Sequence, residues 1–146
     1  MIWPHVWSGA AASLLAESND PSGKGIVWKG STAAEGPLVR ISAEGSSEWG
    51  TTATRDGRWV AYTSDATRRL EVYVRRFDGA GVPLRVSIDG GTAPAWRRDG
   101  RELYFVDDAG RLLAVLVRTV GSAPCRHAPS CSSTADSRSR PTGSTT

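Results

Sequence analysis

Hydrophobic and polar positions alternate along the middle of the chain in short runs of strand length. In the run LEVYVR, Leu70, Val72 and Val74 fall on one face, because successive side chains of a strand point to opposite sides. This alternation predicts a half-buried strand. The runs WVAY at 59–62 and LYFV at 103–106 are apolar at every position and predict inner strands packed between two neighbouring layers. No helix of convincing length is indicated, so we expect an all-β fold.

Tight turns separate these apolar runs. The dipeptides Asp56-Gly57 and Asp99-Gly100 each precede one of them. Glycine supplies the positive φ that a tight hairpin requires, and aspartate hydrogen-bonds to nearby backbone amides in turns. We therefore assign Asp56, Gly57, Asp99 and Gly100 to structural turns and not to acid–base catalysis.

The strands and turns recur at a regular interval. RDGRWVAYTSD at 55–65 and RDGRELYFVDD at 98–108 lie 43 residues apart, and a fainter copy at 14–37 matches 60–83 at a constant shift of 46. A period of about 40–45 residues with short strands is typical of β-propeller blades, each a four-stranded antiparallel sheet. The repeat therefore predicts a partial propeller.

About two and a half blades fit within the repeat. Residues 1–12 are predicted to form a weak or degenerate start of the first blade, and 13–118 the repeat region. The blades are expected near 7–42, 53–87 and 96–118, and the third copy stops before its outer strand.

The composition changes after the third copy. Residues 121–146 contain no Phe, Tyr, Trp, Ile, Leu or Val and are rich in Ser, Thr, Arg and Pro. Such a segment cannot bury enough apolar surface to offset the entropy of ordering, so we expect 119–146 to be a disordered tail. Because the change comes where an outer strand is due, we also expect a truncated or frame-shifted end, which the coding DNA would settle.

Charge and hydropathy restrict the partners of the chain. The formal net charge is +3, and arginines alternate with acids, as in RDGR and RRFD, so we expect a solvated surface and no nucleic-acid groove. No run approaches the roughly 18 apolar residues of a membrane helix. The N-terminal stretch lacks a basic region and is interrupted by Pro4, His5 and Ser8, so no signal peptide is predicted.

Candidate chemistry is sparse, and we expect no catalytic, cofactor-binding or metal-binding residues. The chain has no Gly-x-Ser-x-Gly motif and no kinase motif, and His5 and His127 fall outside the repeats. Cys125 and Cys131 flank His127 at a spacing that fits no standard zinc site. The segment DDAG at 107–110 lacks the spaced carboxylates of a calcium loop and is predicted to be a β-turn.

The repeat resembles a known family. The repeat is similar to the Ser-Pro-Asp-Gly-type repeat of TolB-like β-propellers, as shown by the blocks RDGRWVAYTSD, EVYVRRFDGAG and GGTAPAWRRDGRELYFVDDAGRLLAV. In amino-acid sequence these blocks most resemble the C-terminal propellers of bacterial serine/threonine protein kinases. The resemblance covers about 49–117, with Thr54-Arg55 and Arg97-Arg98 in place of Ser-Pro. It implies a ring of six to eight blades, of which this chain supplies part.

The resemblance implies a non-catalytic propeller module that binds a protein or ligand, within a larger bacterial sensor or periplasmic protein. One alternative is the partial gating propeller of a prolyl-oligopeptidase-type hydrolase without its catalytic domain, and another is a degenerate reading frame without selected function. An open ring leaves blade faces without neighbours, and we expect this at Trp59 and Ala61. The expected partners are a protein, the rest of a larger propeller, or further copies of the chain that associate through open blade edges.

Overall fold

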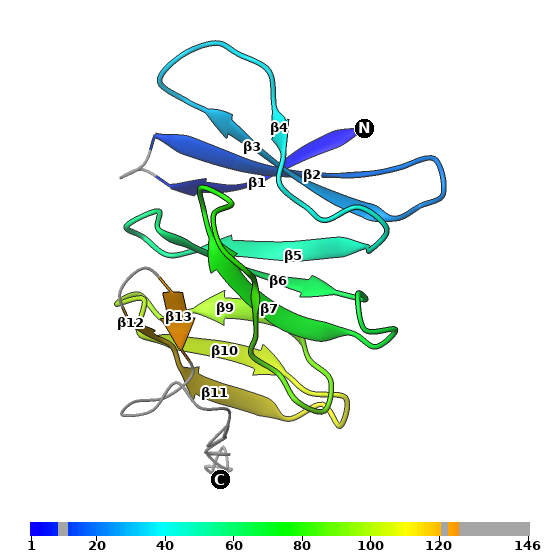
Figure 1. The fold of residues 1–146 in the computed structure, drawn as a ribbon, viewed down its shortest axis with the longest axis vertical. Helices are drawn as coiled ribbons and strands as arrows, with labels where there is room; N and C mark the ends of the chain where they lie inside the picture. The colour runs from blue at the N-terminus through cyan, green and yellow to red at the C-terminus, as the bar shows by residue number, and fades with distance from the viewer. Residues whose placement is uncertain (9–11, 121–122, 126–146) are drawn as a thin grey trace, which may run out of the picture.

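The computed structural model describes residues 1–8, 12–120 and 123–125, and its antiparallel sheets lie side by side (Figure 1). Within three of these sheets, each strand pairs with the next strand along the chain. Sheet 1 contains β1 (Ile2–Ser8), β2 (Ser13–Asn19), β3 (Gly25–Ser31) and β4 (Val39–Arg40). Sheet 2 contains β5 (Glu48–Ala53), β6 (Trp59–Ser64), β7 (Glu71–Arg76) and β8 (Leu84–Arg85). Sheet 3 contains β9 (Thr92–Trp96), β10 (Glu102–Val106) and β11 (Leu112–Leu116).

The predicted all-β fold is confirmed, but the sheets begin earlier than expected. Their first strands start at Ile2, Glu48 and Thr92, before the predicted blade starts near 7, 53 and 96. The first strands were missed because their sequences lack an apolar alternation. The strand EWGTTA, for example, consists mostly of small and polar residues. Polar contacts place this strand, because the backbone N–H and the hydroxyl of Thr51 each donate to Glu17 Oε1 at 2.8 Å.

Residues 1–12, predicted as a weak or degenerate blade start, contain a full-length strand. Strand β1 pairs with β2 from Ile2↔Ser18 to Ser8↔Ser13, with one irregularity between Pro4 and Val6. Proline interrupts a ladder of hydrogen bonds and is found at edge strands and bulges, which fits this position. Residues 9–11 lie outside the described residues.

Two apolar clusters join the sheets. Leu15 and Val27 of sheet 1 pack against Val60, Tyr62 and Phe77 of sheet 2. The second cluster joins sheets 2 and 3 and comprises Ala61, Val72, Val74, Val86, Leu103, Phe105, Val115 and Val117. Sheet 2 is thus buried on both faces, and the prediction for the run at 59–62 is confirmed.

The same packing corrects three predictions. Trp59 and Ala61 do not lie on an uncovered face, since Ala61 is fully buried and both pack in the cluster with sheet 3. Strand β7 is not half-buried, because both of its faces contact a neighbouring sheet and even Arg75 is buried. Strand β10 is buried on one face only, at Leu103 and Phe105. The sequence pattern reports apolar content, whereas burial depends on which sheets flank each strand.

Sheet 3 carries exposed apolar side chains on its outer face. Leu113 packs toward sheet 2, so its neighbour Leu112 points the other way and is 49% exposed. Leu116 lies on the same outer face and is 41% exposed. The outer face of sheet 3 therefore presents apolar side chains to solvent at Leu112 and Leu116.

A short hairpin corrects the predicted start of the tail. Strands β12 (Arg118–Val120) and β13 (Ala123–Cys125) pair antiparallel inside the segment 119–146 that was expected to be disordered. Thr119 and Val120 are β-branched and favour extended backbone, and they precede 121–146, the segment from whose composition disorder was predicted. The remainder of the predicted tail, with His127 and Cys131, lies outside the described residues. The described part contains no helix long and apolar enough to cross a membrane.

The two faces of sheet 3 provide a matched test of the packing. We expect Leu103→Ala to lower the free energy of unfolding by about 2–5 kcal/mol, because it opens a cavity in the cluster between sheets 2 and 3. Leu112→Ala, on the outer face, is expected to change it by at most about 0.5 kcal/mol. Urea denaturation followed by far-UV circular dichroism measures both, and equal losses would contradict the assigned packing.

Candidate functional site

The four turn residues assigned from the sequence close two equivalent hairpins. The N–H of Gly57 donates to the Thr54 carbonyl, and the N–H of Gly100 to the Arg97 carbonyl, both at 2.8 Å. Both glycines have a φ of 70°, in the region that disfavours side chains. Gly57 belongs to the hairpin between β5 and β6, and Gly100 to the hairpin between β9 and β10.

The aspartates of these hairpins are hydrogen-bonded within their own turns. Asp56 Oδ1 accepts the Arg58 N–H at 3.0 Å and the Thr54 hydroxyl at 2.6 Å. Asp99 Oδ1 accepts the Arg101 N–H at 2.9 Å. Both carboxylates therefore fix the backbone from which the neighbouring arginines project.

The segment DDAG at 107–110 also forms a turn. Gly110 donates its N–H to the Asp107 carbonyl at 2.9 Å, and Asp107 Oδ1 accepts the N–H groups of Ala109 at 3.0 Å and Arg111 at 2.8 Å. These bonds lower the pKa of Asp107 from its ordinary value of 3.8, with the Arg111 backbone N–H as the largest cause. No group of three or more potential metal-ligating His, Cys, Asp or Glu side chains occurs among the described residues.

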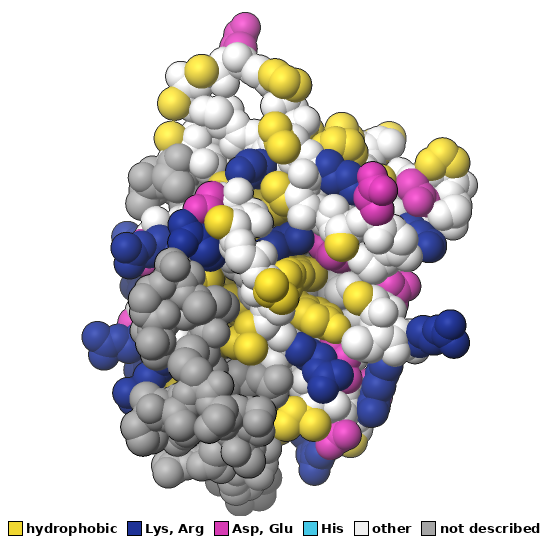
Figure 2. All heavy atoms as spheres, viewed as in Figure 1, with side chains coloured by type: hydrophobic (Ala, Val, Ile, Leu, Met, Phe, Trp, Pro, Cys, Tyr) yellow, Lys and Arg dark blue, Asp and Glu magenta, His cyan; other side chains and the backbone are white. Residues whose placement is uncertain are grey.

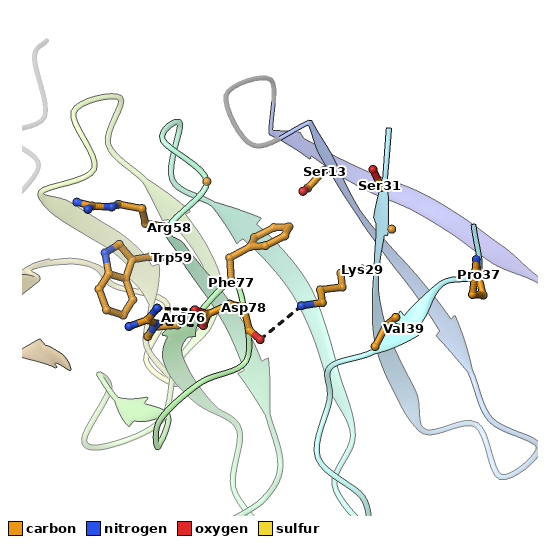
Figure 3. A pocket seen from close by; sticks show the side chains of 12 residues that line it. Ser13, Lys29, Ser31, Pro37, Val39, Arg58, Trp59, Arg76, Phe77 and Asp78 are labelled. Atoms are coloured by element: carbon orange, nitrogen blue, oxygen red, sulfur yellow. Dashed lines mark hydrogen bonds and ion pairs between the residues drawn. The ribbon is translucent and has the colours of Figure 1, made fainter. Parts of the chain in front are cut away.

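A cavity of about 610 Å³ lies between sheets 1 and 2, at the end of sheet 2 that carries the turn between β5 and β6 (Figure 3). Trp59, Phe77 and Val39 supply apolar lining, and the hydroxyls of Ser13 and Ser31 supply polar lining. Binding pockets for small molecules have volumes of about 300–1,000 Å³ and are mostly apolar with a few fixed polar groups. The volume of this cavity falls within that range, and its lining combines apolar with polar and charged groups, so we take it as the candidate functional site.

Charged groups link the two walls of this cavity. Figure 3 shows Lys29 of sheet 1 reaching toward Asp78 of sheet 2, where its Nζ donates to the Asp78 carbonyl at 3.4 Å. Arg76 donates from Nε to Asp78 Oδ1 at 3.0 Å, and this bond is the largest cause of a lowered pKa at Asp78. The carboxylate thus remains ionised and positioned beside the apolar wall.

A buried ion pair in sheet 2 was missed by sequence reasoning. Arg75 of β7 lies 3.0 Å from Glu48 of β5, and their side chains are 7% and 3% exposed. Arg75 also donates to the Ile41 carbonyl at 2.5 Å, and its guanidinium lies over the Tyr62 ring at 4.3 Å. Burial raises the pKa of Glu48 above its ordinary value of 4.5, and Arg75 opposes that shift. The pair therefore ties the segment between β4 and β5 to the middle of sheet 2.

Nothing in the sequence pattern distinguishes this pair from surface charges. Arg75 belongs to the run RRFD, which was predicted to be solvated, and its neighbour Arg76 is indeed 35% exposed. Glu48 is 27 positions away on another strand, so only the strand register brings the two together. The expectation of a solvated surface is wrong at Arg75.

Comparisons with known proteins identify the fold. No family model matches the chain, and no curated protein matches it. The chain is similar to the solved structure of a "putative TolB from Agrobacterium tumefaciens", with 21% sequence identity and a TM-score of 0.62. The match covers 87% of this chain and 46% of that one, so the chain spans about half the length of the structure it matches.

This likeness shows a TolB-like β-propeller fold, and the three sheets correspond to part of a propeller. The predicted fold class is therefore confirmed. The finer resemblance to the propellers of bacterial protein kinases stays a prediction, as does the absence of catalytic, cofactor-binding and metal-binding residues.

The buried pair can be tested against its exposed neighbour. We expect Arg75→Met to lower the free energy of unfolding by about 3–5 kcal/mol, because it leaves Glu48 buried without a counter-charge. Arg76→Met, which removes a partly exposed pair with Asp78, should lower it by about 0–1 kcal/mol. The double variant Arg75→Met/Glu48→Gln should recover part of the loss. Urea titrations compare the three, and a double variant less stable than Arg75→Met alone would contradict this account.

The turn at Asp107 predicts a dependence of stability on pH. Its pKa is lowered in the folded state, so its contribution is present above the ordinary value of 3.8 and is lost as the pH falls through the lower folded value. We expect the free energy of unfolding to decline less steeply with acidification in Asp107→Asn than in the original chain. Chemical denaturation across a pH series measures the slopes. Asp89→Asn, at a carboxylate that is 91% exposed, serves as the control, and an equal change in both variants would refute the prediction.

Proposed function

We propose that the chain is a non-catalytic propeller module that binds a small ligand or a short peptide in the cavity between sheets 1 and 2. The observation that carries this proposal is the combination in that cavity of apolar lining from Phe77 and Val39 with the fixed charges of Lys29 and the pair Arg76–Asp78. Apolar lining supplies affinity, and a few fixed polar groups supply orientation. The lining comes from two sheets, so the site requires both blades.

The module acts within a larger protein, according to the same proposal. Support comes from the exposed outer face of sheet 3 at Leu112 and Leu116, since blades of a closed propeller cover each other's faces. The similar structure from Agrobacterium tumefaciens is about twice as long as the part this chain matches. A bacterial sensor kinase or a periplasmic protein is the proposed context.

The coding sequence on both sides of this chain distinguishes the proposal from the hydrolase alternative. A kinase domain upstream supports the sensor. A domain with a Gly-x-Ser-x-Gly motif downstream would instead identify a peptidase with a gating propeller.

Protein-observed NMR with a library of uncharged, drug-sized molecules tests the binding site. We expect binders to shift the signals of Phe77 and Val39, and we expect Val39→Asp to weaken their binding at least about tenfold by placing a charge in the apolar lining. Val82→Asp is the matched control, because Val82 is 87% exposed and does not line the cavity. Binders that are unaffected by Val39→Asp would overturn the site, and turnover of a bound compound would overturn the non-catalytic assignment.

A further inference from the structure

A second cavity, of about 930 Å³, lies between sheets 2 and 3 at the same end of sheet 2. Its walls are the turn between β5 and β6 and the turn between β9 and β10. The two turns are in contact, since a side chain at Gly100 would meet Thr54 Cγ2 at 3.4 Å. This contact fixes the spacing between the arginines that the two turns carry.

The lining of this cavity is strongly cationic. Five arginines face two aspartates in it, and the arginines are Arg55, Arg58, Arg98, Arg101 and Arg118. Figure 2 shows Lys and Arg side chains along the left edge of the molecule, the edge at which Figure 1 places both turns. Arginines that alternate with acids along the sequence are therefore brought together in space at this cavity.

The turn aspartates offset only part of this positive charge, since two carboxylates face five guanidinium groups in the lining. Asp99 also lies 3.5 Å from Arg97, which does not line the cavity. The side chains of Arg55, Arg58, Arg98 and Arg101 make no hydrogen bond or ion pair with another residue in the described part of the chain. Their guanidinium donors are therefore available to a ligand.

Two indole rings complete the lining. Trp59 and Trp96 both line the cavity, and both pack against the apolar cluster between sheets 2 and 3. The buried indole N–H of Trp96 has no acceptor among the described residues. Indole rings bind planar groups by stacking, and guanidinium groups bind phosphate through paired, charge-assisted hydrogen bonds. Indole rings and guanidinium groups therefore line the same cavity.

We propose that this cavity binds a small polyanion with a planar part, of the nucleoside diphosphate class. The arginines of the two turns hold its phosphate groups, and the indoles of Trp59 and Trp96 hold its planar group. The site is distinct from the cavity between sheets 1 and 2, although Arg58 and Trp59 border both.

Isothermal titration calorimetry with ADP, pyrophosphate and adenosine tests the proposal on the full chain. We expect ADP to bind more tightly than pyrophosphate, adenosine to bind weakest, and the affinity for ADP to fall as salt increases, because the contacts are ionic. The double variant Arg98→Gln/Arg101→Gln should weaken ADP binding at least about tenfold, from the loss of charge-assisted hydrogen bonds. Equal affinities for ADP and adenosine would overturn the role of the arginines.

The matched control is Arg85→Gln, at an exposed arginine of β8 outside the cavity. It should leave the affinity for ADP unchanged. If Arg85→Gln lost as much affinity as Arg98→Gln/Arg101→Gln, the loss would follow from the lower net charge of the protein, and the proposed site would be overturned. Tighter binding of a short single-stranded oligonucleotide than of ADP would also overturn it, in favour of a nucleic-acid surface. Val39→Asp should leave ADP binding intact, which separates failure of this site from failure of the cavity between sheets 1 and 2.

Discussion

The packing of one sheet against the next is the interaction on which the rest of the structure depends. Sheet 2 is buried on both faces, and alternate residues of β6 serve the two sides, with Val60 in one cluster and Ala61 in the other. Twisted sheets cannot stay in contact along their full length, so the packed sheets separate toward their ends. Both cavities lie at one such end, and their walls are therefore a consequence of the same packing that forms the core.

The sequence predicted the parts of the fold that local chemistry controls. The repeat of apolar runs and Asp-Gly turns was sufficient to predict the all-β fold and its partial-propeller architecture. First strands such as EWGTTA escaped prediction because backbone pairing and contacts like Thr51 to Glu17 hold them, and these leave no hydrophobic pattern. The hairpin β12–β13 escaped prediction because the composition of 121–146 leaves out the strand Arg118–Val120 that opens the hairpin.

Side-chain associations were harder to predict, and the buried pair of Arg75 and Glu48 shows why. Removing two charges from water is costly, and the pair is tolerated because Arg75 also bonds Ile41 and lies over Tyr62. These partners come from different strands, so the arrangement exists only in one register. The clustering of arginines has the same origin: Arg55 and Arg98 are one repeat apart in sequence, and the contact between adjacent turns makes them neighbours in space.

The repeat-equivalent arginines connect the period of the sequence to the chemistry of the surface. Both copies of the RDGR turn lie at the same end of adjacent sheets, so a fixed sequence period becomes a fixed spacing of cations in space. A further blade with the same turn would extend this row of cations, and an acidic replacement in one copy would shift where along the row an anion binds.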